Sequence, residues 1–421
     1  MIKTFDDPLI FKAKALEWAA SFDVCCCLDS NKFTDPYSKF DCLIAVEVKN
    51  QLTTSSGTAF AELEKFRSIN PGWIAGFFGF DLKNETEQLS SGNNDHLHFP
   101  DLFFFAPQYL ILIYGNTIEI IADDPAGILT AIDSQADHSA AEQLPVKIES
   151  RFGKAEYLDA VTRIKDHIAR GDIYVTNFCQ EFYAENAAID PLDVFAKLNE
   201  ISPAPFAAFL KWNGKYVIAA SPERFLAKRG EKLISQPIKG TAKRGKDQTE
   251  DEAIKQQLRN QTKEQQENVM IVDLVRNDLT RSAKPGTVKT EELFGIYSFK
   301  QVHQMISTVV AELDPNISAI SAIKNAFPMG SMTGAPKVSA MKLMEQYERS
   351  KRGVYSGAIG YFSPDGDFDF NVVIRTLLYN QQNKYLSFQA GSAITFHADA
   401  EHEYEECLLK VRAIKEVLGQ S

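Results

Sequence analysis

The chain has 421 residues, of which 44% are hydrophobic and 24% are charged, an ordinary composition for a globular protein with a buried core. Its 45 Lys and Arg residues against 56 Asp and Glu residues give a formal net charge of −11. This is the wrong sign for a protein that binds nucleic acid by neutralising phosphates. We therefore exclude nucleic acid as an expected partner, and the length predicts about two or three domain-sized units.

The sequence does not predict a membrane-spanning or secreted protein. The apolar stretch at residues 98–114 is interrupted by Pro100, Asp101 and Pro107, well short of about 20 clean apolar residues. The N-terminus mixes Asp and Lys and lacks the pattern of a secretory signal. The six cysteines contain no CxxC pair and are interpreted as small buried hydrophobes of a reducing compartment. We expect a cytoplasmic protein without membrane contact.

The first third of the chain has the pattern of a β-sheet. Short apolar runs alternate with polar turns, and these runs are DVCCCL, CLIAVEV, WIAGFFGF, YLILIYG and TIEIIA. Residues 133–151 are polar without periodicity and predict a surface connection. A boundary near Lys147 would separate region 1–146 from region 147–421.

Helices and strands mix in the second region. A helix is predicted at residues 154–170, where Gly171 would end it, and three strands follow in IYVTNF, FAAFLKW and YVIAAS. A charged helical stretch is expected at residues 248–281, and a last helix at residues 399–418 with Asp399 as its N-cap. Strand runs with interspersed helices favour an α+β fold.

The last predicted helix carries charged residues on one face. Glu403, Glu406 and Lys410 follow one another at i, i+3 and i+7, so they project from the same side of the helix. Two such carboxylates can hold a hard divalent cation. A solvated face with Glu–Lys pairing would give the same pattern.

Two further positions combine a charge with apolar neighbours. Glu267 begins an apolar helical run that carries several other charges, and buried helices hold such charges when they are paired or bind a ligand. Lys239 lies between Ile238 and Gly240, where loss of solvation would lower its pKa and make it a nucleophile or a base. The structural alternatives are a salt bridge for Glu267 and a turn for Lys239.

Glycine-rich segments are candidates for binding an anion. Residues 327–337 (FPMGSMTGAPK) form a small-residue turn ahead of a predicted helix. Their spacing is not that of a phosphate-binding loop, but N–H groups there can bind a carboxylate. Small residues around Gly391 would let a ligand approach the backbone, and Arg375 can bind a carboxylate with its planar fork.

Taken in order, these motifs resemble those of the chorismate-utilising enzymes, the family of anthranilate synthase component I and aminodeoxychorismate synthase component I. The resemblance covers residues 157–415 and is weaker in the N-terminal region. Its motifs are SPERF, PIKGTAKRG, ENVMIVDLVRNDL, FPMGSMTGAPK, YSGAIGYF, VVIRT, AGSAI and EYEEC. It implies an α+β fold of two stacked, largely antiparallel β-sheets with helices packed outside. Regions 1–146 and 147–421, the second binding chorismate, would form one intertwined unit.

The resemblance also implies roles for individual residues. Glu267, Glu403 and Glu406 match the family's Mg²⁺-associated glutamates, and Glu223 matches a general acid/base beside the C4 hydroxyl of chorismate. The other matched positions would line the substrate pocket or bind its carboxylates, and they are Thr241, Gly330, Ser331, Thr333, Tyr355, Arg375, Gly391, Ser392 and Lys410.

Lys239 distinguishes the branches of this family. PIKGT is similar to the aminodeoxychorismate synthases, a transaminase-class activity in which this lysine adds to C2 and displaces the C4 hydroxyl before ammonia attacks C4. Anthranilate synthases, the first alternative, carry PIAGT. Isochorismate and salicylate synthases, the second alternative, activate water with a lysine at the position of Val175. A non-catalytic subunit is disfavoured, because a dead site has no need for so many charges.

The resemblance implies chorismate and ammonia as substrates, with ammonia supplied by a glutamine amidotransferase subunit. The product, 4-amino-4-deoxychorismate, would feed 4-aminobenzoate and folate synthesis. No Cys–His–Glu constellation of an amidotransferase is visible in the sequence, which favours a separate donor. Two departures from the family pattern stand out. Gln304 replaces a histidine, with His303 one residue earlier, and Ala393 replaces a glycine, next to Ser392 as a substitute hydrogen-bond donor.

Overall fold

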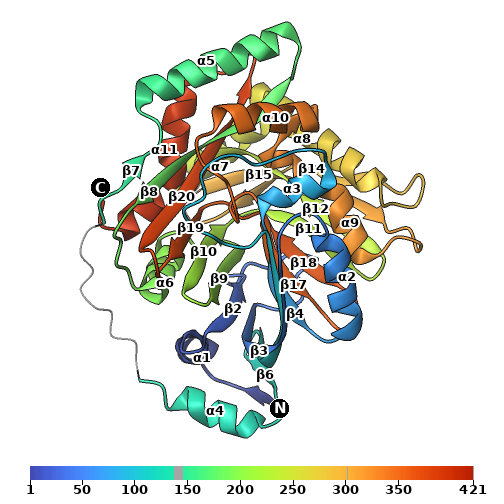
Figure 1. Cartoon of the computed structure of the whole chain (residues 1–421), viewed down its shortest axis with the longest axis vertical. Coiled ribbons are helices and arrows are strands. Elements are labelled where there is room, and N and C mark those ends of the chain that lie inside the picture. Colours follow the sequence, from blue (N-terminus) through green and yellow to red (C-terminus); the bar gives the residue numbers. More distant parts are fainter. Residues whose placement is uncertain (137–145, 301, 421) are drawn as a thin grey trace.

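The computed structural model describes residues 1–136, 146–300 and 302–420. In this part of the chain, 20 strands form one hydrogen-bonded network, and helices cover its outside (Figure 1). Residues 137–145, the middle of the predicted surface connection at 133–151, lie outside the described residues.

The strands of the network form two series of neighbours, here called arms. In the first arm, strands of region 1–146 pair with strands of region 147–421. Cys26 pairs with Ala45 on one side and with Leu210 on the other, all antiparallel, so a strand of region 1–146 is bonded directly to a strand of region 147–421. In pairing order the arm contains β1 (Ile2–Thr4), β6 (Thr117–Ile121), β5 (Leu102–Tyr114), β3 (Cys42–Thr54), β2 (Val24–Asp29), β9 (Phe206–Trp212), β10 (Lys215–Ser221), β19 (Thr376–Asn380), β20 (Tyr385–Thr395) and β8 (Val175–Ala184), with β7 (Glu149–Ser150) and β16 (Gly334–Ala335) beside β8.

The second arm starts from the same long strand. The first half of β5 pairs with β4 and its second half with β6, so the two expected sheets are layers of one continuous network. The layers share a core in which Phe77, Phe104 and Phe370 pack with Leu210 and Leu378. This arm contains β4 (Ile74–Phe78), β17 (Ala358–Phe362), β18 (Phe368–Asn371), β11 (Arg224–Arg229), β12 (Lys232–Gln236), β15 (Val302–Glu312), β13 (Ile238–Lys243) and β14 (Lys289–Ser298).

Helices cover both layers. Those on the first arm bury a second apolar core that includes Tyr157, Phe178 and Val411. They are α1 (Pro8–Ala20), α4 (Pro125–Asp133), α5 (Lys154–Arg170), α6 (Pro191–Ile201), α10 (Lys337–Tyr347) and α11 (Ala400–Val417). Along the second arm lie α2 (Ala59–Ile69), α7 (Gln248–Asn260), α8 (Thr262–Thr280) and α9 (Ala319–Ala326), and the short turns are η1 (Phe80–Leu82), α3 (Lys83–Thr86) and η2 (Gly330–Met332).

Two predicted helices are confirmed closely. Helix α5 ends at Gly171, which has a φ of 84° and caps the helix in the left-handed conformation. Helix α11 begins after Asp399, whose carboxylate accepts the His402 backbone N–H at 2.9 Å. Glu403 and Cys407 lie on the face of α11 that packs inward, so the chain buries one of the predicted glutamates.

The charged stretch at residues 248–281 is two helices instead of one. Gln261 is extended, with φ −73° and ψ 109°, and separates α7 from α8. Each helix has its own anchor: Asp251 of α7 accepts from the His303 ring at 2.8 Å, and Asn268 of α8 accepts from the Ser307 hydroxyl at 2.6 Å. The break lets both helices make these contacts with β15.

The apolar stretch at residues 98–114 mostly forms β5, which crosses the core of the sheet. Among the helices in the described ranges, none has the length and apolar composition needed to cross a membrane. The six cysteines are buried and free of disulfides, as the interpretation of them as small hydrophobes requires.

Candidate active site

Lys239 lies within a group of carboxylates from two helices. It projects from β13, and its Nζ is 2.8 Å from Oε2 of Glu267 on α8. Burial alone would lower the pKa of Lys239, but the negative charges of Glu267, Glu406 and Glu264 outweigh burial and raise it. The expected fall in pKa is therefore wrong, because carboxylates distant in sequence surround the ammonium group.

Helix α11 brings the other charged residues to this group. Although burial would raise the pKa of Glu406, the ammonium groups of Lys410 and Lys239 lower it to about 2. Lys410 Nζ lies 2.5 Å from Glu406 Oε1 and donates to the Gly391 carbonyl at 2.7 Å. Glu403 is only 3% exposed, and burial together with the charge of Glu406 raises its pKa.

Three side chains on α11 form a candidate cation site. One ligand atom each from His402, Glu403 and Glu406 can be chosen so that all lie within 4.8 Å of one another. Carboxylate oxygens suit Mg²⁺, and a cation there would offset the repulsion that raises the pKa of Glu403. Glu267, the third predicted Mg²⁺ ligand, is instead paired with Lys239. The donor set on α11 therefore fits a divalent cation.

Arg375 is held against α11 and immediately precedes β19. Its Nη1 donates to the Lys410 carbonyl at 3.1 Å, and its backbone adopts a φ of 53°, which is uncommon for a residue with a side chain. Burial lowers the pKa of Arg375, with Tyr355 and Glu406 opposing the shift. Tyr355 is buried and its pKa is raised, first of all by that burial. These contacts bring the predicted anion-binding residues to one place.

Gly391 and Ser392 lie in the middle of β20, where neighbouring side chains alternate between faces. A Cβ on Gly391 would lie 2.6 Å from Cys179 Sγ and 2.7 Å from Asn177 Oδ1, so packing alone already requires glycine here. The Ser392 hydroxyl is buried and lies 3.1 Å from the Tyr157 hydroxyl. Ser392 thus contacts α5 through Tyr157, and its donation to a substrate stays a prediction.

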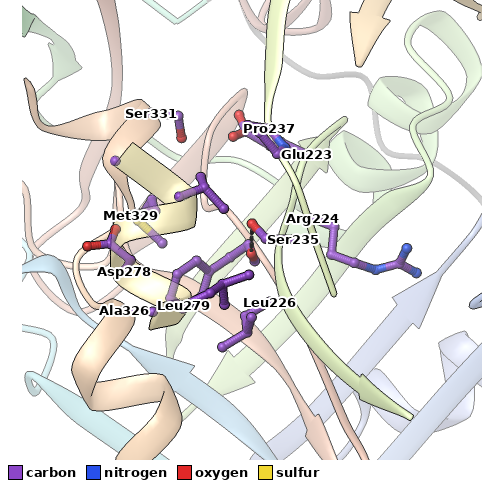
Figure 2. Close-up of a pocket in the computed structure, with 13 residues that line it drawn as sticks. Glu223, Arg224, Leu226, Ser235, Pro237, Asp278, Leu279, Ala326, Met329 and Ser331 are labelled. Carbon is purple, nitrogen blue, oxygen red and sulfur yellow. Dashed lines mark hydrogen bonds between the residues drawn. The ribbon is translucent and has the colours of Figure 1, made fainter. Parts of the chain in front are cut away.

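Glu223 lines a recess between the second arm and α8 (Figure 2). Burial raises its pKa to about 7, although the nearby Ser331 hydroxyl, the Ile238 amide and the Lys239 ammonium group oppose the shift. A carboxyl with this pKa can exchange a proton near neutral pH. Arg224, the next residue, points away from the recess and pairs with Asp35 and Asp369.

The turn around η2 forms the opposite wall of the recess. Gly330 and Ser331 line it, and the buried Ser331 hydroxyl is close enough to Glu223 to oppose the rise of its pKa. The Thr333 hydroxyl instead lies within 3.2 Å of the Met329 carbonyl and 3.3 Å of the Gly330 carbonyl. Thr333 therefore stabilises the turn, whereas Ser331 lines the recess beside Glu223.

His303 and Gln304, where the sequence departs from the family pattern, make different contacts. His303 is fully buried, with Nδ1 2.9 Å from Ser298 Oγ and Nε2 2.8 Å from Asp251 Oδ1, so its ring holds α7 to the sheet. Gln304 is paired across the strands with the exposed Thr241. Its Oε1 is buried and has no partner in the described parts of the chain. Of the two residues, Gln304 is the one with unused hydrogen-bonding capacity.

Sequence reasoning missed two members of this group. Glu264 precedes Glu267 by one helical turn and helps to raise the pKa of Lys239, and the i, i+3 spacing could have indicated it. His402 lies at i and Glu406 at i+4 on α11, a spacing that places two ligands on one face. Both were overlooked because the sequence alone did not show which helix face points towards Lys239.

Comparison with known proteins shows the family of the chain. A family model described as chorismate binding enzyme matches residues 23–416. Aminodeoxychorismate synthase component 1 of Klebsiella aerogenes is 35% identical over 347 residues, which cover 82% of this chain and 76% of that protein. Anthranilate synthase component 1 of Cereibacter sphaeroides is 32% identical over 365 residues, covering 81% and 72%.

A solved structure has the same fold. The crystal structure of anthranilate synthase component I from Streptococcus pneumoniae superimposes with a TM-score of 0.81 at 25% identity, covering 91% of this chain and 93% of that one. The fold class expected from the motifs is confirmed. Since the family model extends over almost the whole sequence, the chain belongs to the family of chorismate binding enzymes.

Proposed function

We propose that the chain is component 1 of an aminodeoxychorismate synthase and converts chorismate and ammonia to 4-amino-4-deoxychorismate and water. The observation that carries this assignment is the position of Lys239, whose Nζ lies 2.8 Å from Glu267 and within the field of Glu406. A primary amine beside the predicted metal-binding glutamates can act on the ring of the substrate itself. The reaction is a transfer of an amino group, of the transaminase class.

The proposed reaction has two displacements at the ring. Lys239, once deprotonated, adds to C2 while the C4 hydroxyl leaves, and Glu223 donates the proton that makes this hydroxyl depart as water. Ammonia then attacks C4, and the Lys239 amine is expelled from C2 so that the ring regains its original double-bond pattern. Burial keeps the Glu223 carboxyl protonated up to about pH 7, which suits it to the role of acid.

Charged residues would orient chorismate for these steps. Mg²⁺, bound by Glu403 and Glu406 with Glu267 nearby, would supply positive charge to a substrate carboxylate. Arg375 donates to the Lys410 carbonyl, and the side chains of both residues would bind substrate carboxylates. Tyr355 would line the same pocket. We assign Thr241, Gly330, Ser331 and Gly391 to the walls of the same pocket, and Thr333 and Ser392 to its support.

We further propose a separate glutamine amidotransferase as the source of ammonia and a cytoplasmic location for the complex. The name component 1 of the relatives supports a two-component enzyme. Anthranilate synthase activity is the second candidate, because a relative of that name is 32% identical. It is disfavoured by Lys239. Water-activating chemistry is disfavoured by Val175, which is a buried apolar residue of β8.

Replacing Lys239 by alanine tests this assignment. With chorismate, Mg²⁺ and an ammonium salt, the unmodified chain should form 4-amino-4-deoxychorismate, identified by its mass. Lys239→Ala should lower the rate roughly a thousandfold, since the nucleophile is lost. The matched control is Lys243→Ala, which removes an exposed lysine from the same strand and should retain the rate. Anthranilate as the product, or equal amination by both variants, would contradict the proposal.

A further inference from the structure

The histidine beside the glutamate pair has no role in the function proposed above. His402 precedes Glu403 and stands four residues before Glu406, in the first turns of α11. Ligand atoms of the three residues lie within 4.8 Å of one another. Neighbouring ligands of one ion are separated by about 3 Å when each bond is about 2.1 Å long, so a small rotation of these side chains would bring all three onto one cation.

The His402 imidazole is free to make that rotation. Its side chain is 67% exposed, and its Nδ1 lies 4.0 Å from Glu403 Oε1, which is too long for a hydrogen bond. The backbone beneath it is fixed, because the His402 N–H donates to the Asp399 cap at 2.9 Å. The ring can therefore turn towards the carboxylates without any change in α11.

The two carboxylates are more firmly placed. Glu403 is 3% exposed and lies on the face of α11 that packs inward with Cys407 and Val411. Glu406 is held by Lys410 at 2.5 Å. A cation that binds between these residues meets two carboxylates that their surroundings hold in place, and the most exposed of the three ligands is the imidazole.

An imidazole changes which cations such a site prefers. Mg²⁺ favours oxygen ligands and keeps several waters, whereas imidazole nitrogen is a good ligand for the later first-row transition ions. We propose that His402 is a nitrogen ligand of the cation bound by Glu403 and Glu406, so that the site selects transition ions such as Co²⁺ over Mg²⁺ through this residue. The inference rests on the proposed cation site of the glutamates.

Co²⁺ is a suitable probe because its visible spectrum responds to nitrogen ligands. The full-length chain, without substrate, is titrated with Co²⁺ and separately with Mg²⁺ by calorimetry, and the Co²⁺ titration is repeated in the spectrophotometer. His402→Ala should weaken Co²⁺ binding about tenfold or more, since loss of even an indirect ligand contact costs this much. It should change Mg²⁺ binding less than about twofold.

A matched control removes a different exposed histidine. His397→Ala, just before α11, should leave both affinities and the Co²⁺ spectrum unchanged. Glu406→Gln, at a partly exposed position, should weaken both ions, which places Co²⁺ at the glutamates. The inference is overturned if His402→Ala leaves Co²⁺ binding unchanged, if it weakens both ions equally, or if Glu406→Gln does not affect Co²⁺.

The amination assay separates this inference from the proposed function. A chain that aminates chorismate with Mg²⁺, but binds Co²⁺ equally well with and without His402, disproves the nitrogen ligand alone. A chain that loses Co²⁺ affinity in His402→Ala, but forms no 4-amino-4-deoxychorismate, disproves the proposed reaction alone.

Discussion

At the scale of single residues, the pKa values at the site are set by the balance between burial and neighbouring charges. Lys239 is kept as an ammonium group by carboxylates from α8 and α11, and Glu406 is kept ionised by Lys410 and Lys239 in spite of burial. The ammonium groups of Lys239 and Lys410 also act on Glu223, but its burial outweighs them and its pKa rises to about 7. The same protein thus holds one carboxylate that is ionised at neutral pH and one carboxyl that titrates close to it.

The raised pKa of Glu223 predicts a pH dependence. As an acid Glu223 must be protonated, whereas Lys239, whose pKa is raised, must lose its proton, so the rate of amination should rise with pH up to about 7 and then level off. Glu223→Gln should lower the rate about a hundredfold near neutral pH, and its rate should keep rising above pH 7 as Lys239 loses its proton. The measurement is kcat against pH for both proteins. An unchanged pH dependence in Glu223→Gln would show that another group is the acid.

The raised pKa of Glu223 also makes stability depend on pH, in the opposite direction to the lowered pKa of a salt-bridged carboxylate. The native pKa of Glu223, about 7, is above the ordinary value of 4.5, so folding is favoured most below about pH 4.5 and loses this contribution as the pH rises to about 7. Glu223→Gln removes the cost of ionising a buried carboxyl. At pH 8 it should therefore raise the melting temperature relative to the unmodified chain.

The sequence allowed prediction of residue types at the site but not of their electrostatics. The motifs placed Lys239, Glu267 and Glu406 in one active site, and the structure brings their charges together. The direction of the Lys239 pKa shift was not predictable from its neighbours Ile238 and Gly240. It depends on carboxylates far away in the sequence, which only the tertiary fold positions.

At the scale of elements, a buried ion pair joins the segments around the site. Arg352 lies 2.5 Å from Glu348, and it also donates to the carbonyls of Met332 and Asn177, at 2.8 and 2.9 Å. It thereby connects η2, β8 and the segment before β17. Few of its hydrogen-bonding groups are left for other partners, so its role is to hold these elements in place.

Breaking this pair should be costly. Arg352→Ala would leave the Glu348 carboxylate buried and unpaired, which should lower the free energy of unfolding by about 3–5 kcal/mol. Urea unfolding at pH 7 measures the loss. The control is Arg163→Ala, which breaks an exposed pair with Asp159 on α5 and should change stability little. Equal effects of the two substitutions would contradict the structural role of Arg352.

Periodicity and capping residues predicted elements well where the signals were local. Gly171 and Asp399 each mark a helix end that the structure reproduces. The break at Gln261 was not predictable, because no glycine or proline marks it. It arises from the contacts of α7 and α8 with β15, including the Asp251–His303 contact.

At the scale of the whole molecule, we propose that regions 1–146 and 147–421 fold as one unit. Strand β2 is hydrogen-bonded between β3 and β9, and β4 lies between β5 and β17. Each region therefore supplies strands that the other needs as neighbours. Composition could not predict this interleaving, because strand pairing across the chain leaves no periodic signal in either segment.

Separating the two regions tests this proposal. A fragment of residues 147–421 would expose the edges of β9 and β17, so it should lack a cooperative unfolding transition when expressed alone. The full-length chain should unfold in a single transition by circular dichroism and by calorimetry. A fragment with the same midpoint as the full chain would show that the regions are independent domains.

The central claim, that Lys239 bonds to the substrate ring, can be tested by the intact mass of the protein. The chain is mixed with chorismate and Mg²⁺ without ammonia, quenched over a series of times and weighed, and the modified peptide is then identified. We predict a mass gain equal to chorismate less one water, located on Lys239 and missing in Lys239→Ala. Amination without such an adduct at any time, or an adduct that persists in Lys239→Ala, would contradict the account.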